Sequence, residues 1–508
     1  MTTQPAAFLA GKHRPIFWIV LLAIFSLALA IRLDDLSDLP ADTVRPLHSA
    51  RIARGMYYQG LANISEWERE FAIALGKTEQ IIEPPILEAL TAATYRMLGR
   101  EELWIAGFYS LLLWTVAGIP LFLLAKELTS AVGALVSLAF YLFLPYAIEM
   151  SRSFQPDPLM VAALIFALWA LARWGNDQGW RWALLFGILA GLAIFIKAVA
   201  IFPILGAWIG LLIGRGEFKK AIRQPQIWVI GALALLPAVI YYFYGSILAG
   251  FLSGQSGGRF IPAMLIQPLF YIRWELKAAE VVGQIPIFLG LLGLLFFDSV
   301  SKKGYMIGLW GGYILYGLTL PHHIASHPYY HLPLVPIVAL SLAPLADTLF
   351  RKLDEKWNHS ARVHVYVSGL LLAGLVFISW EVHVGFKGVD YRGQIAYWEE
   401  IGEKLNYSSA VIALTQDYGY PLSYWGWINA RIWPSYGDLR YREKIGGNNP
   451  DFASLFTLMT AGQDFFLVTR FEEFDYQPEL EQYLYNHYPI YDQGEDYLIF
   501  DLQRSINP

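Results

Sequence analysis

A series of long apolar segments between residues 15 and 382 constrains this chain more than any other feature. Of its residues, 56% are hydrophobic and 16% are charged, whereas a soluble domain has about 45–50% and about 25%. A helix crosses the hydrocarbon core with about 20 apolar residues. The sequence therefore predicts an α-helical polytopic membrane protein of about eleven spans, at 15–32, 103–125, 131–149, 158–174, 182–197, 198–214, 227–248, 284–298, 304–320, 331–348 and 364–382.

The composition also excludes several classes of function. The net charge is −5, so no basic excess is present to hold a nucleic-acid backbone. Cysteine is absent, which excludes disulfides, thiolate catalysis and cysteine metal sites. Neither a phosphate-binding loop of the Walker type nor a dinucleotide fingerprint after a strand is found.

The positive charges of the short loops predict the orientation. With a cytoplasmic N-terminus, lysine and arginine gather in the loops that would be cytoplasmic, for example at 215–223 and 351–362. The short outer turns contain little beyond Arg152 and Lys197. An odd number of spans then places the tail on the non-cytoplasmic side.

The expected domains are a membrane module, residues 1–382, and a soluble extracytoplasmic α/β domain, residues 383–508. Within the module, the first outer loop (33–102) is expected to contain interfacial helices at 46–58 and 84–98. A second outer loop (249–283) contains the Gly/Ser-rich stretch 253–258 and is interpreted as a lid.

Alternating elements predict the fold of the tail. Residues 410–414, 464–469 and 497–500 are expected to be strands, the first two parallel and buried. Residues 397–405 and 479–487 are expected to be helices. Their alternation is typical of a small α/β domain.

Charged and histidine residues gather at the outer ends of the spans, which favours a reaction at the outer interface over a path across the bilayer. Carboxylates held near cations can act as bases. The candidates are Asp34, Asp35, Asp38 and Asp42 with Arg45, His48, Arg51 and Arg54 after the first span; Glu149, Arg152 and Asp157 in one turn; and Lys197 at a span end. Simpler interpretations are a solvated loop, a helix cap at Asp157, and a lysine that snorkels to the interface.

Four of the ten histidines fall in the outer turn 321–331, at His322, His323, His327 and His331. Their spacing matches no standard ligand motif, so hydrogen bonding to a phosphate is as good an interpretation as a metal site. Chance clustering is the third alternative.

Several stretches in this order resemble the GT-C glycosyltransferases, in the branch of the protein O-mannosyltransferases and the aminoarabinose transferase of lipid A. They are 45–58, Glu83-Pro-Pro-Ile86 with 95–99, 151–157, 191–197 and 329–336. Together they span residues 45–350.

The resemblance implies a GT-C-type fold and transfer of a sugar, with inversion, from a polyprenyl phosphate to an acceptor hydroxyl on the outer face. The usual base is an acid at the start of the first loop helix. Here Arg45 and Pro46 occupy that position, so the nearest upstream acid, Asp42, is the predicted base, with Asp35 and Asp157 as further catalytic candidates. The residues expected to bind substrate or phosphate are Arg45, Arg54, Glu83, Arg152, Lys197, His322, His323, His327, Tyr330 and His331.

The expected partners are a polyprenyl-phosphate sugar, membrane lipid, and a glycan, lipid or protein acceptor, in a bacterial plasma membrane. No cofactor is assigned, and a divalent metal stays open. A lipid-linked sugar transporter or flippase is the rival, although it would need polar groups at the midplane that the spans lack. A non-catalytic relative in envelope assembly is the third alternative.

Overall fold

The computed structural model describes residues 14–38, 43–62, 64–252, 261–357, 361–388, 390–444 and 449–506. The chain divides into two compact units. The membrane unit comprises residues 1–37 and 80–389, and the C-terminal unit comprises residues 38–79 and 390–508. Residues 38–79, which the sequence analysis assigned to the first outer loop of the membrane module, are therefore grouped with the tail.

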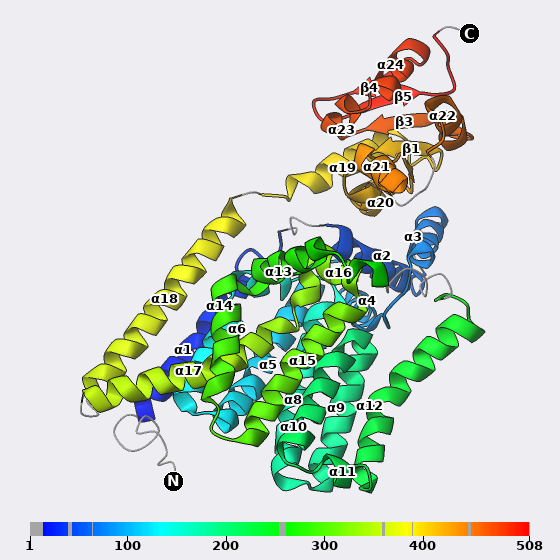
Figure 1. Ribbon diagram of the computed structural model, residues 1–508. Coiled ribbons are helices and arrows are strands. Elements are labelled where there is room, and N and C mark those ends of the chain that lie inside the picture. The colour runs from blue at the N-terminus through cyan, green and yellow to red at the C-terminus, as the bar shows by residue number, and fades with distance from the viewer. Residues whose placement is uncertain are drawn as a thin grey trace. The chain divides into compact units, whose positions relative to one another are not determined.

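The membrane unit is helical (Figure 1). Its elements are α1 (Arg14–Leu33), α4 (Ile86–Leu98), α5 (Trp104–Leu128), α6 (Ala131–Phe143), α7 (Pro145–Met150), α8 (Pro156–Asp177), α9 (Trp180–Ile196), η3 (Ala198–Ala200), α10 (Ile201–Gly214), α11 (Phe218–Ala221), α12 (Pro225–Phe243), η4 (Tyr244–Leu248), η6 (Pro262–Met264), α13 (Pro268–Val282), α14 (Gln284–Gly293), η7 (Leu294–Phe296), α15 (Val300–Thr319), α16 (Pro321–Ser326), η8 (Pro328–His331), α17 (Leu334–Lys356) and α18 (Ala361–Lys387).

Six of the helices in the described ranges are long and apolar enough to cross a membrane. The pair α13–α14, bent by 91°, is a seventh if it counts as one span. Three apolar helices are shorter, at 131–143, 180–196 and 198–214. The membrane character is confirmed, whereas these long helices do not by themselves reach the predicted eleven spans. The segment predicted as a lid-like loop, 249–283, contains α13, and its Gly/Ser-rich part lies outside the described residues.

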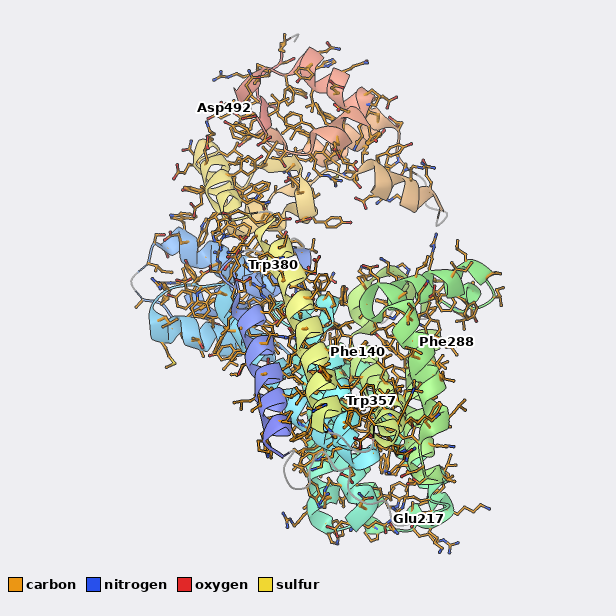
Figure 2. The ribbon with its side chains drawn as sticks, turned by 90° about the vertical axis from the view of Figure 1, so that its left-hand side faces the viewer. Phe140, Glu217, Phe288, Trp357, Trp380 and Asp492 are labelled. Atoms are coloured by element: carbon orange, nitrogen blue, oxygen red, sulfur yellow. The ribbon has the colours of Figure 1, made fainter. Side chains whose placement is uncertain are left out.

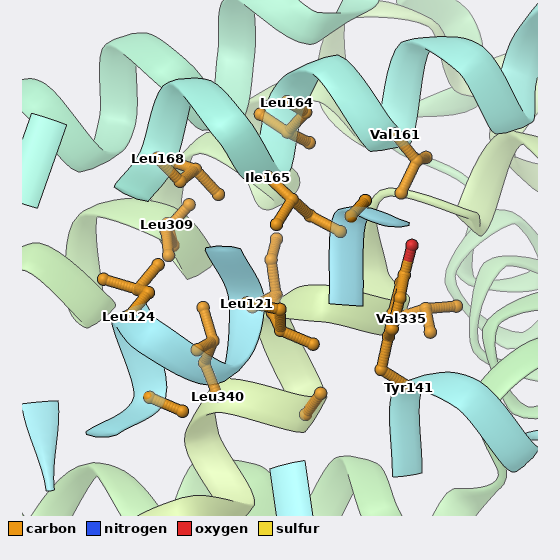
Figure 3. Packing of buried hydrophobic residues seen from close by; sticks show 14 of the residues in the cluster. Leu121, Leu124, Tyr141, Val161, Leu164, Ile165, Leu168, Leu309, Val335 and Leu340 are labelled. Carbon is orange, nitrogen blue, oxygen red and sulfur yellow. The ribbon is translucent and has the colours of Figure 1, made fainter. Parts of the chain in front are cut away.

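Helix α8 is the centre of the bundle, since 78% of its apolar 18-residue stretch is buried. Helices α12 and α18 are peripheral, since only 17% and 22% of their apolar stretches are buried. Figure 3 shows Ile165 of α8 near Leu121 of α5, and Leu168 of α8 near Leu309 of α15. Peripheral side chains such as Phe288 and Trp380 are 67% and 62% exposed (Figure 2), as suits a lipid-facing surface. Because lipid is as apolar as leucine, close packing rather than exclusion of water holds such helices together.

The tightest helix pair is α10 with α15, where glycines face each other. A Cβ atom on Gly210 would lie 2.1 Å from the Gly304 carbonyl oxygen, and one on Gly308 would lie 2.0 Å from the Gly206 oxygen. Only glycine permits this approach, which is the small-residue packing common between membrane helices. It fixes α15 rigidly against α10.

The C-terminal unit has a five-stranded sheet of order β2-β1-β3-β5-β4. Strand β1 pairs in parallel with β2 and β3, and β5 pairs antiparallel with β3 and β4. Its elements are α2 (Val44–Tyr58), α3 (Glu66–Thr78), α19 (Gly393–Lys404), β1 (Val411–Leu414), η9 (Gln416–Gly419), α20 (Tyr420–Tyr424), β2 (Arg431–Ile432), α21 (Tyr436–Lys444), α22 (Phe452–Thr460), β3 (Phe465–Val468), α23 (Phe471–Asp475), α24 (Pro478–His487), β4 (Ile490–Gln493) and β5 (Leu498–Asp501).

The predicted helices and strands of the tail are present, within a few residues of their expected bounds, and the predicted parallel pairing of β1 and β3 is confirmed. Helix α3, the tail helices α20 to α23, and strands β2 and β4 were not predicted. Strand β4 has mostly exposed residues and β2 is two residues long, so neither has the apolar pattern of a buried strand.

Candidate functional site

Lys197 and Asp157 form a buried ion pair at the ends of two helices of the membrane unit. Asp157 is the second residue of α8, after Pro156, and Lys197 stands in extended conformation at the break between α9 and η3. The Lys197 Nζ donates to both Asp157 carboxylate oxygens, at 2.8 and 2.9 Å. The two residues are 4% and 1% exposed. An ionised pair in such an apolar setting is costly unless both charges are satisfied, so this contact marks a candidate site.

Glu83 and two tyrosines complete the surroundings of this lysine. Glu83 Oε1 lies 3.8 Å from the Lys197 Nζ, an ion-pair distance that is longer than a hydrogen bond. The ammonium also lies 4.9 Å from the ring centroid of Tyr330 and 5.5 Å from that of Tyr329. One ammonium therefore faces two carboxylates and two ring faces. We call Glu83, Asp157, Lys197, Tyr329 and Tyr330 the Lys197 cluster, and its formal charge is −1.

Further acidic groups lie near this cluster. The Tyr146 hydroxyl on α7 is within electrostatic range of Asp157, Glu149 and Glu280. Glu280, on α13, is itself paired with Lys277 at 2.6 Å. The surroundings of the cluster are thus rich in carboxylates, which favours a neutral or positively charged group beside it over an anionic one.

The histidine turn lies next to the tyrosines of the cluster. The ring of His323 is 5.1 Å from that of Tyr330, and the ring of His327 is 5.4 Å from that of Tyr329. Among the ring contacts of the described residues, His322 has one, with the His323 ring at a centroid distance of 5.6 Å. His331 is buried, and both of its ring nitrogens are used, by the Tyr313 hydroxyl at 2.7 Å and the Ile324 carbonyl at 2.8 Å. These bonds hold the turn together.

Over the described ranges, no group of three histidine or acidic side chains is arranged to hold a metal ion. What the structure shows of the histidine turn is stacking against tyrosine rings and hydrogen bonds within the turn.

Asp35 and Arg152 belong to a second group, which joins α18 to the turns that follow α1 and α7. Asp35, at φ 51°, pairs with Lys387 at 2.9 Å. Asp34 pairs with His383 at 2.6 Å. The Arg152 guanidinium lies 4.1 Å from the ring centroid of Phe386. Asp42, the predicted base, lies outside the described residues.

Arg45 and Arg54 are on α2, in the C-terminal unit. The Arg54 guanidinium donates to the Tyr424 carbonyl and lies 3.6 Å from the Tyr424 ring and 4.6 Å from the Trp427 ring. Arg45 is within electrostatic range of Glu79. These described contacts anchor α2 within its own unit.

Glu79 is the centre of that anchor and was not singled out from the sequence. Its carboxylate pairs with Arg51 Nε at 2.9 Å and His48 Nε2 at 3.2 Å, and it accepts from the Tyr420 hydroxyl at 3.2 Å. Burial raises the pKa of Glu79, although the Arg51 guanidinium opposes the shift. Burial and the nearby Glu79 carboxylate raise the pKa of Tyr420 to about 12, so its hydroxyl stays a donor.

Tyr146 and Tyr316, beside the Lys197 cluster, were not predicted from the sequence. The only signal in the sequence that could have indicated them is their position near a helix end, where tyrosine is enriched in membrane proteins. Of the predicted residues, the structure brings together Glu83, Asp157, Lys197 and Tyr330, with His323 and His327 one ring further out.

Comparisons with known proteins give one family match and several similar folds. Residues 82–244 match the family model described as dolichyl-phosphate-mannose-protein mannosyltransferase. No curated protein matches the chain by sequence.

Two solved structures are similar over most of the chain. ArnT from Cupriavidus metallidurans, solved bound to undecaprenyl phosphate, has a TM-score of 0.59 and 15% identity over 95% of this chain and 97% of its own. The oligosaccharyltransferase AglB from Archaeoglobus fulgidus, in complex with an inhibitory peptide and a dolichol-phosphate, has a TM-score of 0.54 and 11% identity over 96% of this chain and 74% of its own. At these identities the likeness shows a shared fold.

Proposed function

We propose that this chain, a GT-C superfamily protein by its fold and by the family model it matches over residues 82–244, transfers a sugar from a polyprenyl-phosphate-linked donor to an acceptor hydroxyl on the outer face of the membrane. The observation that carries the proposal is the Lys197 cluster. A buried lysine held by two carboxylates under two tyrosine rings stands at helix ends, within a fold shared with a protein solved bound to undecaprenyl phosphate.

The reaction that we propose is a single displacement with inversion. A carboxylate takes the proton of the acceptor hydroxyl, whose oxygen forms the new bond to the anomeric carbon. The bond between that carbon and the phosphate oxygen breaks, and its electron pair leaves with the polyprenyl phosphate. Positive charge develops at the anomeric carbon during this step.

The cluster's charge suits that transition state. Its formal charge of −1 would stabilise a positive centre in a low-dielectric site. Because Asp157 already neutralises Lys197, the cluster is less suited to bind the departing phosphate. We assign that role to the neighbouring His323 and His327 rings with the Tyr330 hydroxyl.

Two carboxylates are candidates for the base. One is Asp42, the nearest acid upstream of the family's usual base position, which Arg45 and Pro46 occupy here. Among the described carboxylates, Asp34, Asp35 and Asp157 are engaged in pairs with His383, Lys387 and Lys197. Glu83 is the alternative, because it is partly exposed and lies beside the same lysine at 3.8 Å.

The proposed topology has eleven crossings, a cytoplasmic N-terminus and an extracytoplasmic C-terminal unit. Beyond the six long helices, the bent pair α13–α14 supplies one crossing, the shorter apolar helices α6, α9 and α10 supply three, and α15, of 20 residues, supplies the eleventh. Support comes from the lysine and arginine bias of the predicted cytoplasmic loops.

The test is incubation of the purified full-length chain in nanodiscs with a panel of polyprenyl-phosphate sugars and acceptors. Release of free polyprenyl phosphate is measured. Asp42→Asn is expected to lower turnover by about 10²–10⁴-fold if Asp42 is the base. If Glu83→Gln shows this loss of turnover and Asp42→Asn stays active, Glu83 is the base. A chain that releases no polyprenyl phosphate from any donor contradicts the proposed activity.

A further inference from the structure

Three buried tyrosines of α15 differ in what their hydroxyl groups contact. The Tyr305 hydroxyl donates to the Leu168 carbonyl at 2.8 Å. The Tyr313 hydroxyl accepts from Trp274 Nε1 at 2.9 Å and is bonded to His331 Nδ1 at 2.7 Å. The Tyr316 hydroxyl is also buried, in a side chain that is 1% exposed, yet it has no hydrogen-bond partner among the described residues.

The Tyr316 ring is held in place by tight packing. It stacks on Phe202 of α10, with centroids 5.7 Å apart and planes at 22°. One turn earlier, a Cβ atom on Gly312 would lie 2.3 Å from the Phe202 carbonyl oxygen, so the two backbones touch where the rings meet. Rotation of the ring about its own axis leaves the hydroxyl oxygen in place. The hydroxyl is therefore presented at a fixed position and cannot turn away to find another partner.

This fixed position is near the Lys197 cluster. The Tyr316 hydroxyl is within electrostatic range of Asp157, Tyr329 and Tyr330, which come from α8 and η8. Tyr305, which lies three turns away on the same helix, is instead within electrostatic range of Glu127 near the opposite end of the bundle.

A buried hydroxyl without a partner is disfavoured, and native proteins leave few of them. Where one is rigidly held beside a candidate site, a ligand oxygen is the natural acceptor. We propose that Tyr316 is a specificity-determining residue that donates a hydrogen bond to an oxygen of the donor's sugar-phosphate headgroup. This inference rests on the proposed function and names a group that acts on the donor itself.

The variant Tyr316→Phe removes the hydroxyl and keeps the ring. Because that hydroxyl has no protein partner to lose, the ligand-free melting temperature of Tyr316→Phe is expected to equal or exceed that of the parent. Affinity for the donor is expected to fall about 10-fold, the effect of one hydrogen bond to a charged or polar ligand oxygen.

Tyr305→Phe is the matched control, since it makes the same change on the same helix where the hydroxyl does have a partner. Its ligand-free melting temperature is expected to fall, while its affinity for the donor stays that of the parent. The two variants should therefore show opposite patterns.

Binding is measured on the full-length chain in nanodiscs by the ligand-induced shift in melting temperature, with two probes. One is undecaprenyl phosphate and the other is an undecaprenyl-phosphate hexose that the parent protein uses. If Tyr316→Phe loses affinity for both probes, the acceptor oxygen is on the phosphate. If it loses affinity for the undecaprenyl-phosphate hexose alone, the acceptor oxygen is on the sugar.

Two results overturn the inference. One is an unchanged affinity of Tyr316→Phe for both probes. The other is a lowered ligand-free melting temperature, which indicates that a buried water already satisfies the hydroxyl. Failure of the parent chain to bind or use any polyprenyl-phosphate probe instead refutes the proposed function, so the two failures are distinguishable.

Discussion

Replacement of Lys197 by methionine tests the buried pair at the centre of the site. Methionine keeps most of the stem and removes the ammonium, which leaves the Asp157 carboxylate without the donor that holds both of its oxygens. Removing one partner of a buried ion pair costs about 3–5 kcal/mol of stability. We therefore expect Lys197→Met to lower the stability by about 4 kcal/mol.

Asp157→Asn is expected to cost less than Lys197→Met at pH 7, because the lysine keeps Glu83 at 3.8 Å. The double variant Lys197→Met with Asp157→Asn removes both charges and should recover most of the loss.

The assay is the melting temperature of the purified chain in detergent, followed by tryptophan fluorescence at pH 7. Lys277→Met is the matched control, since its pair with Glu280 is partly exposed and worth at most about 1 kcal/mol. If Lys197→Met is as stable as the parent, or if the double variant is no more stable than Lys197→Met, the reasoning from a buried charged pair is wrong.

Further predictions address the packing, the C-terminal unit and the topology. Gly308→Val would place a Cβ atom 2.0 Å from the Gly206 oxygen and should lower the free energy of unfolding by roughly 3 kcal/mol, seen as a lower melting temperature. An unchanged melting temperature would mean that α10 and α15 are not in contact there. Because the pKa of Glu79 is raised in the folded state, its stabilising contribution is present below about pH 4.5 and is lost as pH rises through the folded-state pKa. The stability of the parent relative to Glu79→Gln should therefore fall as pH rises from 4 to 8. A constant difference in stability would contradict this. Reporter fusions after Arg223 and after Tyr391 should lie on opposite sides of the membrane, and finding both on one side would refute the topology.

Much of the fold could be predicted from the sequence, because it depends on local patterns. Apolar length predicts membrane helices, and period-two or continuous apolar runs predict the strands of the tail. The resemblance to the GT-C glycosyltransferases rested on the order of short motifs, and it is confirmed by the family model and by the likeness to ArnT. The number of spans was less predictable, because several apolar helices are short or bent.

The sequence also identified Asp157 and Lys197 as charged residues at helix ends, since charges in such places are conspicuous among apolar spans. It did not show that they pair, because they lie 40 positions apart and only the packing of α8 beside α9 brings them together. That pairing changes the chemistry expected of Lys197, from an open phosphate ligand to the neutralised centre of an acidic cluster.

The sequence by itself determined which segments are apolar, where charges gather, and which family the motifs resemble, because each of these is a property of neighbouring residues. Only the tertiary structure decided that residues 38–79 join the tail, that both nitrogens of His331 are used within its turn, and that the Tyr316 hydroxyl is buried without a partner in the described chain. These facts depend on contacts between distant segments. A hydrogen bond or an ion pair requires a partner within about 3–4 Å, and no local pattern specifies which distant atom the fold will place there.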